Sequence, residues 1–210
     1  MPALESLLND LANLDAQHDL DGLRRTRETI VAEHPESQAA VEALYKIGLD
    51  LLFRQRDLAG ALAKFEEAAQ RKHPYWSAAA RTSAALCYYH QKRVQKAVLE
   101  LRKVSYPEEP NAHSVTALVF LETIFANEGQ REEVRRVRKD RINQLEELTR
   151  LSRERNLMAE RGHYLYMLGL ALRDQGEDGR AKAVLEDAKN LGAEILGADL
   201  FRSVIEALAR

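Results

Sequence analysis

The stretch that decides the fold runs from Gly162 to Ala188 and reads GHYLYMLGLALRDQGEDGRAKAVLEDA. Apolar residues recur in each half at steps of three and four, first at Leu165, Leu168 and Leu172 and then at Ala181, Leu185 and Ala188. This is the period of a helix. The segment QGEDG at 175–179 separates the halves, and its Gly and Asp residues are typical of a turn. The stretch therefore predicts two helices joined by a short turn.

Gly169 lies inside the first of these helices, where a glycine costs about 1 kcal/mol relative to alanine. A second glycine, Gly48, holds the same place in a similar pattern earlier in the chain. A residue that weakens its own helix needs a packing reason, and the close approach of a neighbouring helix supplies one. We therefore predict that both glycines lie at tight contacts between helices.

The pattern recurs along the chain, as a search for internal repeats shows. A copy with one extra residue in its turn near Arg56 comprises Leu44, Ile47, Gly48, Leu51, Ala61, Phe65, Ala68 and Pro74. A third copy runs from Arg81 to Pro110, and weaker copies lie at Leu118–Arg138 and Leu7–Pro35. The equivalent positions are 38, 36, 37 and 47 residues apart, measured between Leu23, Ala61, Ala97, Val134 and Ala181.

The order of these residues, a bulky residue, Leu, Gly and Tyr, then a Gly-Asp turn and Ala, Phe, Ala and Pro, resembles the tetratricopeptide repeat. The resemblance is clearest at Leu44–Pro74 and Leu165–Ala188 and covers most of the chain. It implies an all-α fold in which antiparallel helix pairs stack into a right-handed superhelical solenoid with a concave and a convex face. The expected organisation is one domain, 1–210, with repeats at about 4–36, 41–75, 78–111, 115–148 and 157–192.

Two features depart from the family's pattern. The spacings of 36 to 38 residues exceed the family's 34, and the last spacing of 47 leaves about 13 surplus residues. Neither Gly nor Pro occurs from Gln130 to Arg161. We therefore expect an extended helical hairpin that breaks near Thr149–Asn156, where Thr, Ser and Asn can cap a new helix. The last segment, 193–210, is expected to form one amphipathic helix that covers the open end of the stack.

Composition narrows the class of protein. Of the 210 residues, 45% are hydrophobic and 30% charged, and the prevalence of Ala, Leu, Glu and Arg is typical of an all-helical protein. The formal net charge of −2 gives no bulk attraction to nucleic acid or acidic lipid. No apolar run approaches the roughly 18 residues of a membrane span, and the first residues are acidic where a signal peptide is basic. A cytoplasmic location is therefore the expectation.

Few residues suggest catalysis or metal binding. Cys87 is the single cysteine, which excludes an intramolecular disulfide and a cysteine-based metal site. The six histidines show no HxxxH or HExxH spacing. Cys87 and His90 stand three residues apart on a predicted helix, as a Cys–His nucleophile pair requires, but a buried cysteine that packs as a small hydrophobe is the better interpretation. We therefore predict no enzymatic activity, no cofactor and no metal.

The tract REEVRRVRKDR at 131–141 places several cations, Arg131, Arg135, Arg138 and Lys139, along one side of a helix. Such a row can follow a phosphate backbone. However, ten basic and seven acidic residues alternate over 131–161, and base-stacking aromatic residues are absent from the tract. We interpret it as a solvated helix face with ion pairs, and a site for an acidic partner is the alternative. No nucleic-acid partner is expected.

The resemblance also implies a binding surface, because first-helix residues line the concave groove in this family. The positions that match are Tyr45, Leu49, Leu52, Phe53, Leu86, Tyr89, His90, Val119, Thr123, Asn127, Tyr166, Leu170 and Arg173. The set is unusually apolar and rich in tyrosine, which is typical of interaction surfaces. It lacks the Lys, Asn and Arg clamp with which some family members grip a chaperone's C-terminal carboxylate. An amphipathic helix or an extended apolar segment is therefore the predicted ligand.

Two functions fit this surface. In the one we prefer, the protein is a non-catalytic adaptor or scaffold that holds a segment of a partner protein in the groove. In the other, it is a homo-oligomeric structural or assembly component, and the groove or the terminal helix docks another copy. A neighbouring element of the same chain, such as the extended hairpin, is a further candidate to fill the groove.

Overall fold

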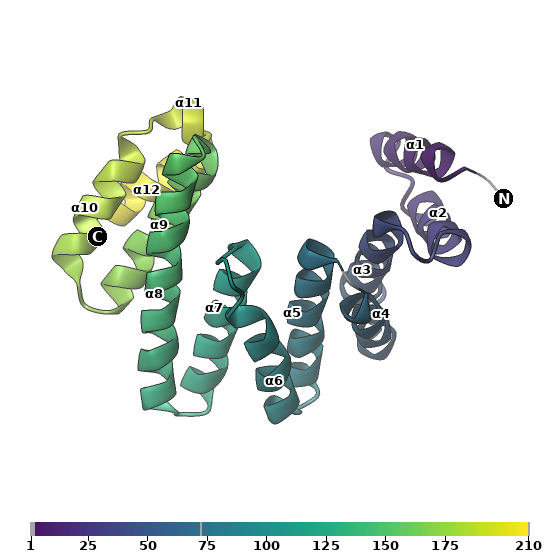
Figure 1. The fold of residues 1–210 in the computed structure, drawn as a ribbon, viewed down its shortest axis with the longest axis horizontal. Helices are drawn as coiled ribbons and strands as arrows, with labels where there is room; N and C mark the ends of the chain where they lie inside the picture. The colour runs from purple at the N-terminus through teal and green to yellow at the C-terminus, as the bar shows by residue number, and fades with distance from the viewer. Residues whose placement is uncertain (1–2, 72, 210) are drawn as a thin grey trace. The chain divides into compact units, whose positions relative to one another are not determined.

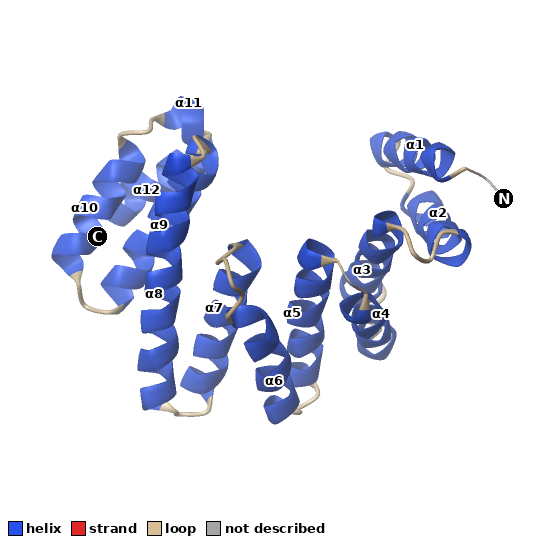
Figure 2. Ribbon diagram, in the orientation of Figure 1, coloured by secondary structure: helices blue, strands red, loops and turns tan. Residues whose placement is uncertain are grey.

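Helices form all the regular structure in the computed structural model, which describes residues 3–71 and 73–209 (Figures 1 and 2). The all-α expectation is confirmed, and no strand occurs among the described residues. The described residues form twelve helices, which are α1 (Leu4–Ala16), α2 (Leu20–Glu33), α3 (Gln38–Phe53), α4 (Leu58–Gln70), α5 (Pro74–His90), α6 (Val94–Ser105), α7 (Ala112–Asn127), α8 (Arg131–Glu154), α9 (Met158–Asp174), α10 (Asp178–Lys189), α11 (Ala193–Leu196) and α12 (Ala198–Leu208).

The chain divides into two compact units, unit 1 (Met1–Val104) and unit 2 (Ser105–Arg210). Unit 1 contains the pairs α1–α2, α3–α4 and α5–α6, and unit 2 contains α7–α8, α9–α10 and the C-terminal helices α11 and α12. In unit 1 each helix from α1 to α4 packs against the next, and in unit 2 each helix from α7 to α9 does the same. The helix pairs follow the expected repeats, although the third begins earlier than predicted and the fourth ends later. A single domain over 1–210 stays a prediction.

The turns inside the helix pairs confirm the register of the repeat. Each turn has one residue with a φ between 55° and 86°, namely His18, Arg56, Lys92, Gly129 and Gly176. These residues are 38, 36, 37 and 47 apart, which are the spacings predicted from the sequence. In four of the turns the next backbone N–H donates to a carbonyl five residues earlier, which ends the first helix. The turn at Arg56 has the predicted extra residue, because Asp57 N–H donates to the carbonyl of Leu51.

Side-chain caps explain where several helices begin. Asp19 and Asp57 stand just before α2 and α4, and each carboxylate accepts a hydrogen bond of 2.9 Å from a backbone N–H three residues later. Ser37 caps α3 in the same way at 3.1 Å. Asn111 and Ser114 form a reciprocal capping box at the start of α7. Each such cap stabilises its helix by about 1 kcal/mol, so these polar residues mark the helix starts along the sequence.

Both interior glycines lie at tight contacts between helices, as predicted. A Cβ atom on Gly48 would lie 2.5 Å from the ring of Phe65 on α4. A Cβ atom on Gly169 would lie 2.5 Å from Cγ of Leu185 on α10. Each glycine therefore lets the first helix of its pair approach a large buried side chain of the second, which offsets its cost within the helix.

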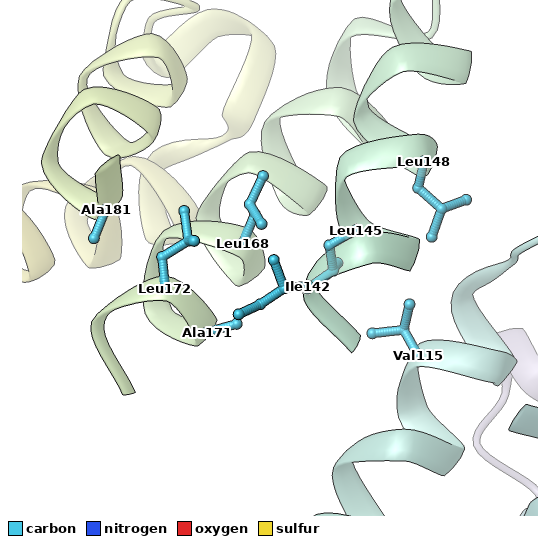
Figure 3. Close-up of a cluster of buried hydrophobic side chains, with 8 residues drawn as sticks. All are labelled: Val115, Ile142, Leu145, Leu148, Leu168, Ala171, Leu172 and Ala181. Carbon is cyan, nitrogen blue, oxygen red and sulfur yellow. The ribbon is translucent and has the colours of Figure 1, made fainter. Parts of the chain in front are cut away.

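The core of unit 2 joins its two helix pairs through a cluster of buried side chains (Figure 3). The cluster takes residues from four successive helices, and its members are Val115, Ile142, Leu145, Leu148, Leu168, Ala171, Leu172 and Ala181. Its two alanines, Ala171 and Ala181, leave room for the larger side chains of the neighbouring helices. Full burial of each leucine contributes about 1.5–3 kcal/mol. The cluster therefore fixes α8 between α7 and α9.

The surplus residues of the fourth repeat lie in α8, which has 24 residues. This helix ends at Glu154, inside the segment where we expected a break, and α9 begins at Met158. A largely buried ion network holds α8 against α7: Glu122 accepts from Arg138 at 2.6 Å and lies 3.1 Å from Arg141. Arg138 also donates to the backbone carbonyl of Asp174 on α9. Part of the tract read as a solvated face is therefore packed between helices.

The C-terminal segment differs from the prediction of one continuous helix. It forms the short helix α11 and then α12, with a break at Gly197, whose φ of 77° is incompatible with a right-handed helix. The break turns the chain so that both helices pack on unit 2. Leu196 from α11 and Val204 from α12 are buried in one cluster with Leu165 and Ala188. The segment thus covers the end of the helix stack in two pieces.

Candidate interaction surfaces

One side of α3 carries a stripe that leads from a hollow to an exposed aromatic ring. Its residues are Ala39, Glu42, Lys46, Leu49 and Phe53, which we call the α3 stripe. They are spaced three or four apart and so share one side of the helix. Leu49 is half-buried, whereas Phe53 is 70% exposed. So exposed a phenylalanine at the end of a helix is open to contact by another molecule.

The N-terminal end of the α3 stripe opens into a hollow of about 310 Å³ between α1, α2 and α3, the N-terminal hollow. Burial lowers the pKa of the Arg27 guanidinium there, and the nearby carboxylates of Asp15 and Asp50 act in the opposite direction. Two cations and two anions thus sit among apolar walls. The lining residues are Leu8, Leu11, Ala12, Asp15, Leu23, Arg27, Ala39, Glu42, Ala43 and Lys46.

Tyr45 belongs to an aromatic cluster that joins α3 to α5. Its ring centroid lies 5.8 Å from that of Phe65 and 5.4 Å from that of Trp76. Tyr75 meets Trp76 edge-on at 4.7 Å and is 53% exposed. Tyr45 therefore packs partly inside the unit, while Tyr75 and Trp76 add aromatic surface that the sequence analysis missed. The sequence HPYW at 73–76 could have indicated this surface. It was missed because α5 begins at Pro74, four residues before the predicted start of the third repeat at 78.

The other predicted groove residues of unit 1 lie near the ends of α3 and α5. Leu52 and Leu86 are half-buried. Tyr89 is half-buried too, and its ring centroid lies 6.5 Å from that of the exposed His90. These side chains are accessible without being fully solvated, which suits a surface that packs against another molecule. Their role in binding stays a prediction.

In unit 2, the predicted residues of α7 present a more polar side. Val119 is half-buried, and the hydroxyl of the exposed Thr123 donates to the Val119 carbonyl at 2.9 Å. Asn127 is exposed at the end of the helix. The Thr123 hydroxyl thus uses its proton within α7, and its oxygen can still accept a hydrogen bond from a ligand.

The predicted residues of α9 lie beside the C-terminal helices. Tyr166 is half-buried against the cluster that contains Leu196 and Val204. Arg173 donates to the backbone carbonyl of Ala207 at 2.8 Å, and Leu170 is half-buried. Elements of unit 2 itself therefore occupy the side of α9 that carries Tyr166 and Arg173. From the sequence, a neighbouring element of the same chain was one candidate to fill the groove, with the extended hairpin as the example. Beside α9 the elements in that place are α11 and α12, and not the hairpin.

A solved structure of similar fold aligns with most of the chain, although neither a protein-family model nor a curated protein matches the chain. A crystal structure of MamA protein aligns with 89% of this chain and 90% of its own, with 14% identity and a TM-score of 0.50. The fold is tetratricopeptide-like. The five turns in register and this alignment show an all-α solenoid of helix pairs, and at such identity the likeness concerns the fold alone.

Two further solved structures align over nearly their whole length. The alignment with a second crystal structure of MamA covers 94% of this chain and 93% of the MamA chain, with 15% identity and a TM-score of 0.49. A tetratricopeptide repeat protein from Parabacteroides merdae ATCC 43184 covers 98% of both chains, with 13% identity and a TM-score of 0.30.

Cys87 lies in the tetratricopeptide-like core of unit 1 and is fully buried. Burial raises the pKa of its thiol to about 11, so the thiol is protonated at neutral pH. Because the thiolate is the nucleophilic form, this cysteine is poorly suited to covalent catalysis. His90 is exposed, whereas Cys87 faces the core. The pair therefore does not form the arrangement that a Cys–His nucleophile needs.

Residues 3–71 and 73–209 show neither a metal-binding cluster nor a membrane-spanning helix. Within these residues, no group of three or more His, Cys, Asp and Glu side chains is placed to hold a metal ion. None of the helices described there combines the length and the apolar character needed to cross a membrane.

Proposed function

We propose that the protein is a non-catalytic adaptor that binds a helix or an extended apolar segment of another protein on unit 1. The observation that carries this proposal is the α3 stripe, which runs from the N-terminal hollow to Phe53, 70% exposed. Exposed aromatic side chains supply much of the binding energy at protein interfaces. A tetratricopeptide-like fold presents such helix faces on a rigid scaffold.

The size and charge of the N-terminal hollow support this kind of ligand. Its volume of about 310 Å³ lies at the small end of the range for ligand pockets and is enough for one or two apolar side chains. Leu8, which is 44% exposed, lies on its wall. Both charge signs line it, with the cations Arg27 and Lys46 and the carboxylates Asp15 and Glu42. An amphipathic segment that inserts apolar side chains and keeps its charged ones at the rim would satisfy both features.

Photocrosslinking tests the proposal. A photoreactive amino acid in place of Phe53 should crosslink a partner in extract from the source cells, and mass spectrometry should identify that partner. The matched control is the same substitution at Leu99, which lies on the second helix of its pair and is 55% exposed. Crosslinking only from position 53 supports the proposal. Equal yield from both positions, or none from position 53, contradicts it.

A pair of substitutions separates the adaptor from an oligomer. Leu49→Asp with Phe53→Asp should abolish binding of the partner that crosslinking identifies. The melting temperature should fall only modestly, because Phe53 is solvent-exposed and Leu49 is only half-buried. Light scattering on the same variant tests the alternative, in which the surface docks another copy. A wild-type oligomer that becomes monomeric in the variant would assign the α3 stripe to self-assembly and contradict the adaptor.

A further inference from the structure

A second hollow lies in unit 2, where α7 turns into α8. Its volume is about 460 Å³, and we call it the α8 hollow. Two side-chain types line it: small apolar groups and guanidinium groups. The residues are Ala126, Gly129, Arg131, Val134, Arg135 and Arg138. Three cations thus surround one concavity that contains no acidic lining residue.

The other described hollows differ from it in their charges. The N-terminal hollow has two cations and two carboxylates. A hollow of about 200 Å³ between α4, α5 and α6 contains three cations and the carboxylates of Glu66 and Glu100. A hollow of about 170 Å³ near the start of α9 contains Arg155 with Glu109 and Glu160. Each of these sites balances most of its own charge, and the α8 hollow does not.

The three arginines of the α8 hollow are engaged to different degrees. Arg138 is held by Glu122 and the Asp174 carbonyl, so it is part of the fold. Arg135 pairs only with Glu132 at 2.9 Å, and the two side chains are 71% and 85% exposed. Such an exposed pair contributes little and exchanges readily. Arg131 is exposed and makes no ion pair with another described residue. Two guanidinium groups are thus available to a ligand.

From this arrangement we propose that the α8 hollow binds an acidic segment of a partner protein. Glutamate or aspartate side chains of the segment bind Arg131 and Arg135, since guanidinium and carboxylate groups form paired, charge-assisted hydrogen bonds. The aliphatic part of the segment packs on Val134 and Ala126. Charge complementarity carries the proposal, which is independent of the function proposed for unit 1.

The same surface is too short to follow a nucleic acid. Arg136 and Lys139 extend the exposed positive charge beyond the hollow, but the helix then becomes mixed in charge. Arg150 pairs with Glu147 and Glu154 at 2.5 Å, and Glu146 pairs with Arg180. A phosphate backbone that continued along α8 would meet carboxylates already facing solvent. A peptide that contacts only the first turns avoids them.

Fluorescence anisotropy with the full chain tests the proposal. The probe is a fluorescein-labelled peptide that contains several glutamates and two leucines, at about 50 mM salt, where surface charges are weakly screened. Arg131→Glu with Arg135→Glu should weaken binding by about tenfold or more. The control, Arg136→Glu with Lys139→Glu, makes the same charge change on exposed residues outside the hollow and should weaken it by about twofold or less. The same peptide with glutamine for glutamate should not bind.

Four results would overturn the proposal. The first is that the wild-type chain does not bind the glutamate peptide. The second is equal weakening in both double variants, which would indicate general attraction to α8. The third is equal binding of the glutamine peptide. The fourth is tighter binding of a duplex DNA that is lost in the Arg131 and Arg135 variant, which would assign the hollow to nucleic acid. If the glutamate substitutions disturb folding, Arg131→Gln with Arg135→Gln makes the same test.

Discussion

Helices α3 and α9 carry the same pattern and meet different surroundings. Gly48 and Gly169 are equivalent, which makes Tyr45 equivalent to Tyr166 and Leu49 equivalent to Leu170. In unit 1 the pattern continues to the exposed Phe53 and opens onto the N-terminal hollow. In unit 2 the C-terminal helices pack beside Tyr166 and bond to Arg173. The repeat pattern therefore determines which side of the helix a residue occupies, whereas the neighbouring helices determine whether its side chain remains accessible to another molecule.

The largest change in stability should come from disrupting the packing of α11 and α12 on α9 in unit 2. Val204 on α12 is fully buried, so Val204→Asp places a charge where water cannot reach it. We expect a loss of about 3–4 kcal/mol in the free energy of unfolding of unit 2. Hydrogen exchange should accelerate in α11, α12 and α9 and stay unchanged in α3 and α4. Unchanged exchange in α9 would show that the C-terminal helices do not cover it.

Overpacking at the equivalent glycines should be the next largest effect. Gly48→Leu and Gly169→Leu each force a side chain against Phe65 or Leu185, where even a Cβ atom would lie at 2.5 Å. Each should cost about 1–3 kcal/mol, measured by urea denaturation. Gly179→Leu is the control, because a Cβ atom at Gly179 meets nothing within 4 Å. An unchanged denaturation midpoint for Gly169→Leu would refute its packing role.

Single truncations compare the two surfaces directly. Tyr166→Ala removes a ring that packs against the C-terminal cluster and should cost about 2 kcal/mol. Phe53→Ala removes a ring that is mostly in water and should change stability by about 0.5 kcal/mol or less. Thermal denaturation of both variants checks the difference. A large loss for Phe53→Ala would mean that this ring supports the fold.

Opposite pH responses should give the smallest effects. Burial lowers the pKa of His113 in unit 2 from 6.5. The folded state therefore binds that proton less well, and unit 2 loses stability as the pH falls below 6.5. Burial raises the pKa of Cys87 in unit 1 from 9.0 to about 11, so unit 1 loses stability as the pH rises above 9.

Substitutions and two separate signals check these pH responses. Trp76, the single tryptophan, reports unfolding of unit 1 by fluorescence, and exchange of α7 reports on unit 2. His113→Gln should reduce the acid response, and Cys87→Ala the alkaline one. If a substitution leaves its pH response unchanged, that response comes from a titratable group other than His113 or Cys87.

The sequence predicted the register because that information is local. Each turn needs one residue with positive φ, and each close helix pair needs a small residue, so both recur once in each repeat. The break at Gly197 could not be predicted in this way, since the apolar spacing of Leu196, Leu200 and Val204 continues through it. Only the packing of α12 on unit 2 selects the left-handed conformation there.

The exposure of side chains on the candidate surfaces depends even more than the break at Gly197 on contacts between residues distant in sequence. The spacing placed Tyr45, Leu49 and Phe53 on the first helix of a repeat. The exposure of each depends on the helices that pack against α3, namely α2, α4 and α5. The cations of the α8 hollow were named from the sequence, with a site for an acidic partner as the alternative interpretation. The hollow itself was not predicted, because a sequence shows that cations and carboxylates alternate and not which of them pair. Arg138 turned inward to Glu122, and Arg131 did not.

Hydrogen exchange of the full chain with and without the partner captured at Phe53 tests the central claim most directly. Binding at the open surface of unit 1 should slow amide exchange in α3 and in the facing helix α1, because bound segments restrict local opening. Exchange in α9 and α12 should stay as it is in the free chain. Slower exchange confined to α9 and α12, with α3 unchanged, would show that the covered surface of unit 2 is the working one and would contradict the account.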